Sequence, residues 1–522
     1  MRWRLPVGLA VLVTLAVVIV AVLTTASSRS NPGRDGGVLT STLPNLASDF
    51  AIARRTVGQP IEPGYLGFSF EFQAVRAYTG SDPGQINPVL VQLIRNVTPG
   101  QAPVLRIGGD STDVSWVPAP GIVAPPGGTY PLTPSWFATT AALARELKAR
   151  LIMGINLAAD QPALAGAEAR GDVSAFGPSA IDAFEIGNEP NVYGKIDNYR
   201  TRSGALRKVR PKNYDFRRFL REFQAESAAL PPLALAGPAL AAGPTPSKGS
   251  WIGSMRSFIE QVPRLSTLTL HRYPLRNCYV GPESPLYPSI ANLLTGRATT
   301  GLADSIEGYV AIAHAHHRLV RVDELNSVAC RGKSGVSDTF ASALWVVDAL
   351  FALARVGVDG VNVHTLPGSA YELFQFSRVD GRWRGSVRPV YYGLMMFARA
   401  APPGSDLLRV TGRRPVGVTV WATRAHDGRV RVTLINDDPS ASRTVNLSPP
   451  RGTSGPVTLQ RLEAPSISAT SGVTLGGRGF GDETYSGRLA PPRTQRLRAR
   501  GGRYALPLPA ASAALITFGR DR

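Results

Sequence analysis

The chain has 522 residues, of which 43% are hydrophobic and 18% are charged, so neither a mainly disordered chain nor a coiled coil fits it. At roughly 100–200 residues per domain, this length predicts two or three domains. The formal charge of +20 comes almost entirely from arginine, since only six of the 57 basic residues are lysine. Because such an arginine excess accompanies biased nucleotide composition, we do not take it as a sign of binding to nucleic acid, and we expect no nucleic-acid partner.

The amino terminus has the pattern of an export signal. Arg2 and Arg4 precede an uncharged, mostly apolar run at residues 5–23, and positive charge ahead of such a run is typical of exported proteins. The run is roughly long enough to span a bilayer. We therefore predict a signal or anchor at 1–26, retained as a single span or cleaved, and an extracytoplasmic stalk at 27–48.

The body of the chain, from 49 to 402, alternates short apolar runs with longer amphipathic segments, which is typical of parallel strands joined by helices. Eight such runs predict a closed (β/α)8 barrel. An open doubly wound sheet is the rival, but its glycine-rich phosphate loop is missing after the first run. The predicted strands lie at 66–72, 104–107, 151–157, 181–186, 233–236, 268–271, 319–322 and 358–363, and the predicted helices include 87–97, 135–149, 214–229, 251–262, 304–317 and 338–355.

From 403 to 522 the pattern changes to short β-rich runs separated by Gly, Pro, Asp and Ser. This pattern predicts an antiparallel β-sandwich as a second domain. Residues 49–60, directly after the stalk, can supply it with an extra strand. The predicted strands lie at 418–422, 429–435, 443–447, 457–462 and 513–518.

Two glutamates follow the fourth and seventh predicted barrel strands. Glu189 lies in a Gly-Asn-Glu-Pro turn, and Glu324 ends the apolar run that begins at 319. The carboxyl ends of all barrel strands meet at one face, where barrel enzymes hold their active sites. Two facing carboxyl groups are what glycoside cleavage requires, because one protonates the leaving oxygen and the other attacks or activates water.

Four motifs resemble glycoside hydrolase family 79, a family of retaining (β/α)8 β-glucuronidases and heparanase-like enzymes. They are RIGGD at 106–110, EIGNEP at 185–190, DELNS at 323–327 and GVSDTFASALW at 335–345. The resemblance covers about residues 50–520. It implies a retaining β-glycosidase that acts on β-glucuronides or uronic-acid-containing glycans and uses no metal or organic cofactor.

The same resemblance implies roles for eight residues. Glu189 would be the acid/base and Glu324 the nucleophile. Asn188 would bind the sugar 2-hydroxyl, and Tyr273 would orient Glu324. The remaining four would contact the sugar: Glu71 and Asp110 through its hydroxyls, and His364 and Tyr371 by lining the subsite nearest the chemistry.

The substrate is less firmly indicated than the chemistry. Some glucuronidases of the family bind the uronate with a tyrosine shortly past the nucleophile, whereas residues 326–330 contain none. Three alternatives stay open: another envelope sugar (an arabinosidase or galactosidase), a non-catalytic glycan-binding envelope protein, and an envelope scaffold whose β-domain binds the partner. Exo or endo action and the oligomeric state are also open.

A basic segment follows Glu189 and would rise on the active-site face, where it can attract an acidic polysaccharide. A solvated surface without such a partner is an equally good interpretation. Its basic residues are Lys195, Arg200, Arg202, Arg207, Lys208, Arg210, Lys212, Arg217, Arg218 and Arg221.

The two cysteines agree with an oxidising compartment. Cys278 lies seven residues after His271, and Cys330 lies six after Glu324. They therefore belong to loops after adjacent strands, and we predict a disulfide that pins the loops around the nucleophile.

Overall fold

The computed structural model describes residues 48–197, 199–201, 203–241, 251–413, 417–453 and 455–520. The predicted anchor and nearly all of the predicted stalk lie outside these residues. Within them, no helix combines the length and the apolar character that a bilayer span needs.

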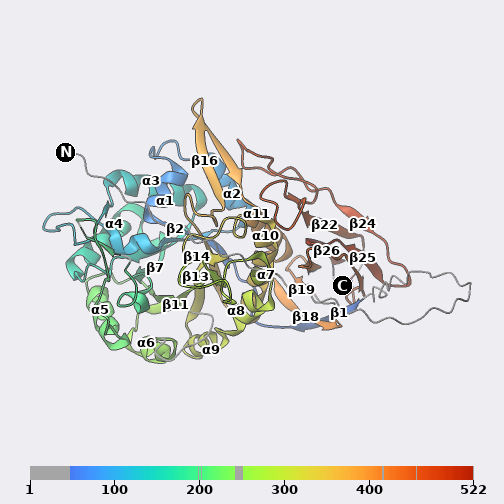
Figure 1. Cartoon of the computed structure of the whole chain (residues 1–522), viewed down its shortest axis with the longest axis horizontal. Coiled ribbons are helices and arrows are strands. Elements are labelled where there is room, and N and C mark those ends of the chain that lie inside the picture. Colours follow the sequence, from blue (N-terminus) through green and yellow to red (C-terminus); the bar gives the residue numbers. More distant parts are fainter. Residues whose placement is uncertain are drawn as a thin grey trace, which may run out of the picture. The chain divides into compact units, whose positions relative to one another are not determined.

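Eight parallel strands close into a barrel in the order β10–β11–β13–β15–β2–β3–β6–β7 (Figure 1). The predicted (β/α)8 fold is confirmed. The strands are nearly continuous apolar runs because parallel strands under a layer of helices are buried on both faces. Their bounds are β2 (Leu66–Glu71), β3 (Val104–Gly108), β6 (Arg150–Ile155), β7 (Ile181–Ile186), β10 (Leu235–Ala241), β11 (Leu265–Arg272), β13 (Leu319–Leu325) and β15 (Gly360–Thr365).

Helices surround the barrel, and five of them were not predicted: α1, α4, α7, α8 and α11. Helix α1 follows β2 without a polar break, and α4 is so rich in alanine and glycine that its apolar face is weakly marked. The helices are α1 (Phe72–Thr79), α2 (Pro88–Val97), α3 (Pro134–Leu147), α4 (Pro162–Phe176), α5 (Phe216–Ala228), α6 (Met255–Gln261), α7 (Ile290–Leu293), α8 (Thr300–Asp304), α9 (Glu307–Ala315), α10 (Phe340–Arg355) and α11 (Pro389–Ala400).

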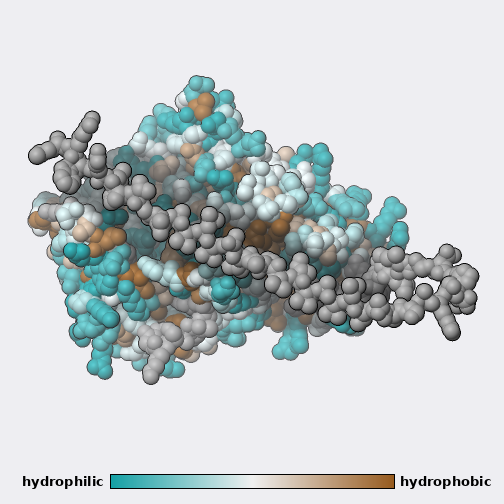
Figure 2. All heavy atoms as spheres, viewed as in Figure 1, coloured by the Kyte–Doolittle hydropathy of each residue, from teal (hydrophilic) through white to brown (hydrophobic). Residues whose placement is uncertain are grey.

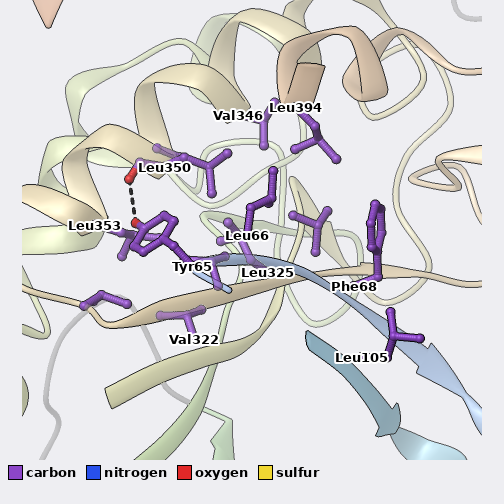
Figure 3. Packing of buried hydrophobic residues seen from close by; sticks show 14 of the residues in the cluster. Tyr65, Leu66, Phe68, Leu105, Val322, Leu325, Val346, Leu350, Leu353 and Leu394 are labelled. Carbon is purple, nitrogen blue, oxygen red and sulfur yellow. Dashed lines mark hydrogen bonds between the residues drawn. The ribbon is translucent and has the colours of Figure 1, made fainter. Parts of the chain in front are cut away.

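Helix α10 packs between the barrel and its neighbours and is almost wholly buried. Figure 3 shows Val346 and Leu350 above Leu66, with Leu394 of α11 beside them. The hydroxyl of Tyr65 donates to the carbonyl of Leu350 at 2.8 Å, so this buried hydroxyl has a hydrogen-bond partner. Hydrophilic side chains dominate the coloured face in Figure 2, as this burial of apolar residues requires.

The C-terminal domain is a ten-stranded network in the order β23–β22–β26–β20–β19–β18–β1–β21–β25, with β24 paired to β22. Strand β1 pairs antiparallel with β18 but parallel with β21, which departs from an all-antiparallel sandwich. Phe50, Val432, Val445 and Ile516 share one buried cluster, so the network folds back on itself. The strands are β1 (Ser48–Thr56), β18 (Asp406–Gly412), β19 (Val418–Arg424), β20 (Arg429–Asn436), β21 (Arg443–Leu447), β22 (Val457–Glu463), β23 (Thr474–Leu475), β24 (Gln495–Leu497), β25 (Tyr504–Leu508) and β26 (Ser512–Arg520).

The barrel and the β-domain belong to one compact unit. Trp421 of β19 is 8% exposed and packs in the same core as the barrel helices. Its indole N–H donates to Asp348 of α10 at 2.7 Å. This contact joins the nucleophile half of the barrel to the β-domain.

A buried carboxyl group between α4 and α5 makes stability depend on pH. Glu226 is 1% exposed, and burial, followed by the nearby Asp160, raises its pKa to about 8. A group with a raised pKa in the folded state binds more protons there than in the unfolded state. The contribution of Glu226 to the free energy of unfolding is therefore largest below its ordinary pKa of about 4.5. This contribution is lost as the pH rises toward 8.

Replacing Glu226 with glutamine should remove this dependence. We expect E226Q to raise the free energy of unfolding at pH 8 by about 1 kcal/mol or more relative to wild type, and to change it little at pH 5. Urea unfolding at both pH values measures this, with the exposed Glu260→Gln as control. An equal effect of E226Q at pH 5 and pH 8 would contradict the assignment.

Candidate active site

The RIGGD motif places a charged residue inside the barrel. Arg106 lies in the middle of β3, and its side chain is fully buried inside the closed barrel. Gly108 makes this possible, because a Cβ there would lie 2.5 Å from the guanidinium Nε. Gly109 takes a φ of 77° and turns the chain so that Asp110 reaches the cleft.

The Arg106 guanidinium bonds to groups from four other strands or their ends, one of them the hydroxyl of Ser69 on β2 at 3.2 Å. Its Nε donates to Glu185 at 2.8 Å, its Nη1 donates to Glu324 at 2.8 Å, and its Nη2 donates to Asn188 at 3.0 Å. Nη2 also lies 3.2 Å from Nε2 of His271. One buried cation therefore holds the two segments that carry the predicted catalytic glutamates.

Glu324 is held as an anion. Arg106 bonds its Oε2, and the hydroxyl of Tyr273 donates to its Oε1 at 2.7 Å. Burial alone would raise the pKa of Glu324, but His364, His271, Arg106 and the Tyr273 hydrogen bond outweigh burial and hold the pKa well below its usual range. An ionised, hydrogen-bonded carboxylate in a dry site is suited to nucleophilic attack.

Glu189 lies in a different environment. Its backbone has a φ of 50°, and its N–H donates to the carbonyl of Ala239 at 3.0 Å, which pins the turn after β7 to β10. The side chain is 24% exposed, against 11% for Glu324. Its Oε1 lies 2.9 Å from Nδ1 of His271, so one of its two oxygens is engaged by the histidine.

The hydrogen bonds of His271 define its tautomer. Burial opposes a charge on the ring, whereas the carboxylates of Glu324 and Glu189 raise its pKa. Nδ1 carries a proton in either protonation state, because both nitrogens are protonated in the charged ring, and in the neutral ring Nε2 must accept from the guanidinium, which can only donate. His271 therefore donates to Glu189. The sequence left this histidine as a simple strand-end residue.

One carboxylate oxygen of Glu189 and one of Glu324 lie within 4.8 Å of each other and of a nitrogen of His271. A retaining glycosidase has its carboxyl groups roughly 5–5.5 Å apart, whereas an inverting enzyme needs about 6.5–9.5 Å. The same three residues could also ligate a metal ion. Arg106 already brings a positive charge to Glu324, and His271 ligates only after losing its Nδ1 proton, so we assign the cluster to proton and glycosyl transfer.

The other predicted residues gather around this pair. Asn188 donates to Asp110 at 3.2 Å, and solvent reaches Asp110 in the cleft. Desolvation by the surrounding protein and the charges of Glu189 and Glu324 raise the pKa of Asp110 to about 7. Glu71 is 4% exposed and accepts from the backbone N–H groups of Asp110 and Ser111, so it also holds the loop after β3.

His364 and Tyr371 close the other side. His364 lies with Nδ1 3.1 Å from the hydroxyl of Ser69 and 3.8 Å from Glu324. The Tyr371 ring lies 5.8 Å from the His364 ring and 6.1 Å from the Tyr273 ring, measured between centroids. All eight predicted residues therefore belong to one connected cluster.

Two further carboxyl groups lie beneath the catalytic pair and were missed. Glu185 and Asp323 are fully buried and lie 2.8 Å and 3.6 Å from Nε of Arg106. Arg106 outweighs burial and lowers the pKa of Glu185, while burial and Glu185 raise the pKa of Asp323 well above its usual value. These opposite directions favour the proton on Asp323 and the negative charge on Glu185. A charged residue that interrupts an otherwise apolar barrel strand was the available signal.

The predicted basic segment is partly neutralised. Arg210 is only 6% exposed, contacts Glu222 at 3.1 Å and donates to the carbonyls of Leu157 and Ala158, so it anchors the loop rather than facing solvent. Lys208 pairs with Asp197 at 2.9 Å. Arg202 lies outside the described residues. The segment therefore presents less basic surface than its composition suggests.

A buried tyrosine connects this loop to the turn that carries Glu189. Tyr193 is fully buried, donates to Asp113 at 2.7 Å, and accepts from the backbone N–H of Asn188 at 3.4 Å.

Tyr193→Phe deletes both bonds and leaves Asp113 without the hydroxyl. We expect about 1–3 kcal/mol less stability and a lower kcat with little change in KM. Urea unfolding and steady-state kinetics test this, and a changed KM at unchanged kcat would contradict the positioning role.

The predicted disulfide is present between Cys278 and Cys330, with Cα atoms 6.1 Å apart. Beside it, β12 (Leu275–Arg276) pairs with β14 (Val328–Ala329), so the loops after β11 and β13 are joined twice. A cavity of about 380 Å³ lies against the disulfide and reaches Glu189, His271 and Tyr273.

Comparisons with known proteins agree with this site. Residues 420–515 match the model of the glycosyl hydrolase family 79 C-terminal beta domain. A β-glucuronidase of Neurospora crassa is 24% identical over 391 residues, 69% of this chain and 67% of that protein. A β-glucuronidase of Aspergillus niger is 27% identical over 223 residues, 37% of this chain and 40% of that protein.

Solved structures share the fold. A 4-O-α-L-rhamnosyl-β-D-glucuronidase from Fusarium oxysporum superposes with a TM-score of 0.69 at 21% identity, over 90% of this chain and 100% of that chain. A family 51 arabinofuranosidase from Xanthomonas axonopodis reaches a TM-score of 0.63 at 16% identity, over 90% and 99%. At these identities the likeness shows the barrel and its β-domain.

Proposed function

We propose that the chain belongs to glycoside hydrolase family 79 and that it hydrolyses β-glucuronides by double displacement, with retention of anomeric configuration. The observation that carries the proposal is the pair of carboxyl groups within 4.8 Å of each other in unlike environments. One of them, Glu324, is buried and held as an anion, whereas the other, Glu189, is open to the cleft.

In the first step, Glu324 attacks the anomeric carbon while Glu189 protonates the departing oxygen. Because His271 donates to Oε1 of Glu189, the transferable proton is placed on Oε2. Asn188, fixed by Arg106 and Asp110, would bond the sugar 2-hydroxyl as the oxocarbenium-like state forms.

In the second step, the glycosyl ester on Glu324 is hydrolysed. Glu189 is now a carboxylate and takes a proton from water, which attacks the anomeric carbon and releases Glu324. The His271 hydrogen bond stabilises this carboxylate, so the same contact serves both steps. Tyr273 keeps its proton, since burial and Glu324 raise its pKa well above the usual value, and it remains a donor to the nucleophile.

Mildly acidic pH would weaken the repulsion between the site and a uronate. A glucuronate would enter beside Asp110, whose pKa is raised to about 7. Below that pH Asp110 is mostly neutral and repels the uronate less. The two β-glucuronidase relatives support this sugar over an arabinoside or galactoside.

The test is release of nitrophenol from aryl β-D-glucuronide, compared with the β-galactoside and the α-L-arabinofuranoside. We expect turnover of the glucuronide only, with NMR detecting the β-anomer of glucuronic acid as the first product. Turnover of another glycoside alone would agree with the proposed roles of the two glutamates but contradict the proposed glucuronide substrate. A first-formed α-anomer would overturn the double displacement.

We also propose that the enzyme acts outside the cytoplasm, secreted or held by its N-terminal segment. The apolar run after Arg2 and Arg4 and the Cys278–Cys330 disulfide support this location. Protease treatment of intact cells should remove the activity, and activity that is lost only after lysis would contradict it.

A further inference from the structure

The cavity beside the disulfide lies on the acid/base side of the catalytic pair. Glu189, His271 and Tyr273 form its inner end, and residues of the loops after β7, β11 and β13, the end of β10 and Trp251 line its described walls. The predicted sugar-binding residues Glu71 and His364 do not line it. Glu189 protonates the leaving oxygen, so the group attached to that oxygen is the one that enters this cavity.

Three polar side chains of the cavity already have partners within the protein. The amide of Asn191 is committed, because its Nδ2 donates to the carbonyl of Ala241 and its Oδ1 accepts from the N–H of Ala241, both at 3.0 Å. The hydroxyl of Tyr273 is bonded to Glu324, and the ring of His271 is bonded to Glu189. A sugar unit would therefore find no free partner among these three side chains, and an unpaired hydroxyl group beside them is costly.

Apolar side chains form part of its walls. Trp251, Leu240 and Leu275 line the cavity together with the Cys278–Cys330 disulfide. Tyr279 follows the disulfide with a φ of 58° and is 79% exposed, so an aromatic ring lies open at the rim. Such walls stabilise an apolar group by removing its surface from water.

Two cations complete the lining. Lys195 is exposed and Arg276 is half-buried, and neither side chain forms an ion pair within the described part of the chain. Apart from Glu189, the described lining contains no carboxylate. The cavity is therefore apolar in part of its walls and positive in its free charges.

We propose that this cavity binds the leaving group of the reaction, and that this group is an apolar aromatic or aliphatic aglycone bearing an anionic group (a carboxylate or a sulfate) rather than a sugar unit. The inference rests on the proposed function. A volume of about 380 Å³ is in the range of a site for one small organic group. The body of the aglycone lies against the apolar walls and Tyr279, and its anion lies near Lys195 and Arg276.

The test compares β-D-glucuronides of 4-methylumbelliferone, of umbelliferone-3-carboxylate, of an umbelliferone sulfonate, and of a neutral monosaccharide. Wild type should show its lowest KM for an anionic coumarin, and the two anions separate carboxylate from sulfate recognition. In the double variant Lys195→Met/Arg276→Met, the ratio of kcat/KM for anionic over neutral coumarin should fall roughly 5-fold, through KM. Lys212→Met, on the same loop but outside the lining, should leave the ratio unchanged.

Two results would overturn the inference: an unchanged ratio in the double variant, or a KM for the glucuronosyl monosaccharide below those of all three coumarins. Tyr279→Ala gives an independent readout, because it should raise KM for the coumarins and not for the monosaccharide glycoside. If wild type hydrolyses no glucuronide, the proposed function fails. The same leaving groups on whichever sugar is accepted then test the cavity by itself.

Discussion

Glu324→Gln should lower kcat by roughly 10⁴-fold or more while the protein stays folded, because glutamine fits the same space but cannot form the glycosyl ester. Tyr273 and Arg106 both bond the native carboxylate, so the substitution also removes the charge they stabilise. Steady-state kinetics on the accepted aryl glycoside measures the loss. The exposed Glu307→Gln, on α9, is the matched control and should keep wild-type activity.

Trapping locates the nucleophile directly. A 2-deoxy-2-fluoro glycosyl fluoride of the accepted sugar should inactivate wild type with a stoichiometric mass increase on the peptide that contains Glu324, since the fluorine slows hydrolysis of the ester. E324Q should stay unlabelled. A label on Glu189, or an E324Q variant with more than about one per cent of wild-type activity, would reverse or refute the assigned roles.

The barrel could be predicted because its strands are buried on both faces and therefore appear as apolar runs in a fixed alternation with helices. Glu189 and Glu324 could be placed for the same reason, since each follows one of those runs. Helix α4 could not be predicted, because alanine and glycine blur the difference between its buried and exposed faces. Strand β1 was expected, but its parallel partner β21 lies about 400 residues away and depends on packing alone.

The buried charged residues beneath the catalytic pair could not be predicted from the sequence, for a different reason. Arg106, Glu185 and Asp323 each interrupt an apolar strand, and sequence spacing does not say that their side chains meet. Arg210 shows the opposite error, since it lies among exposed basic residues in sequence and is buried against carbonyls in the fold. Composition describes a segment's total charge, whereas function depends on which charges keep a partner.

Arg106→Met is expected to have the second large effect, on stability and on the pH profile together. The substitution leaves the buried carboxylates of Glu185 and Glu324 without their cation. Removing one partner of a buried ion pair in this way lowers the free energy of unfolding by about 3–5 kcal/mol. Burial then acts on Glu324 with less opposition, so its pKa rises from its depressed value. The nucleophile must be ionised, so the acid limb of the kcat/KM profile moves to higher pH. Arg106→Lys, which keeps the charge, should move it less.

Arg321→Met separates the two effects. Arg321 is a second buried arginine, at the start of β13, and it bonds Asn362 and the carbonyl of Gly64, away from both catalytic carboxyl groups. This variant should lose stability in urea unfolding yet keep the acid limb of wild type. If Arg106→Met and Arg321→Met shift that limb equally, the low pKa of Glu324 does not depend on Arg106, and the barrel interior tunes the nucleophile through His364, His271 and Tyr273 instead.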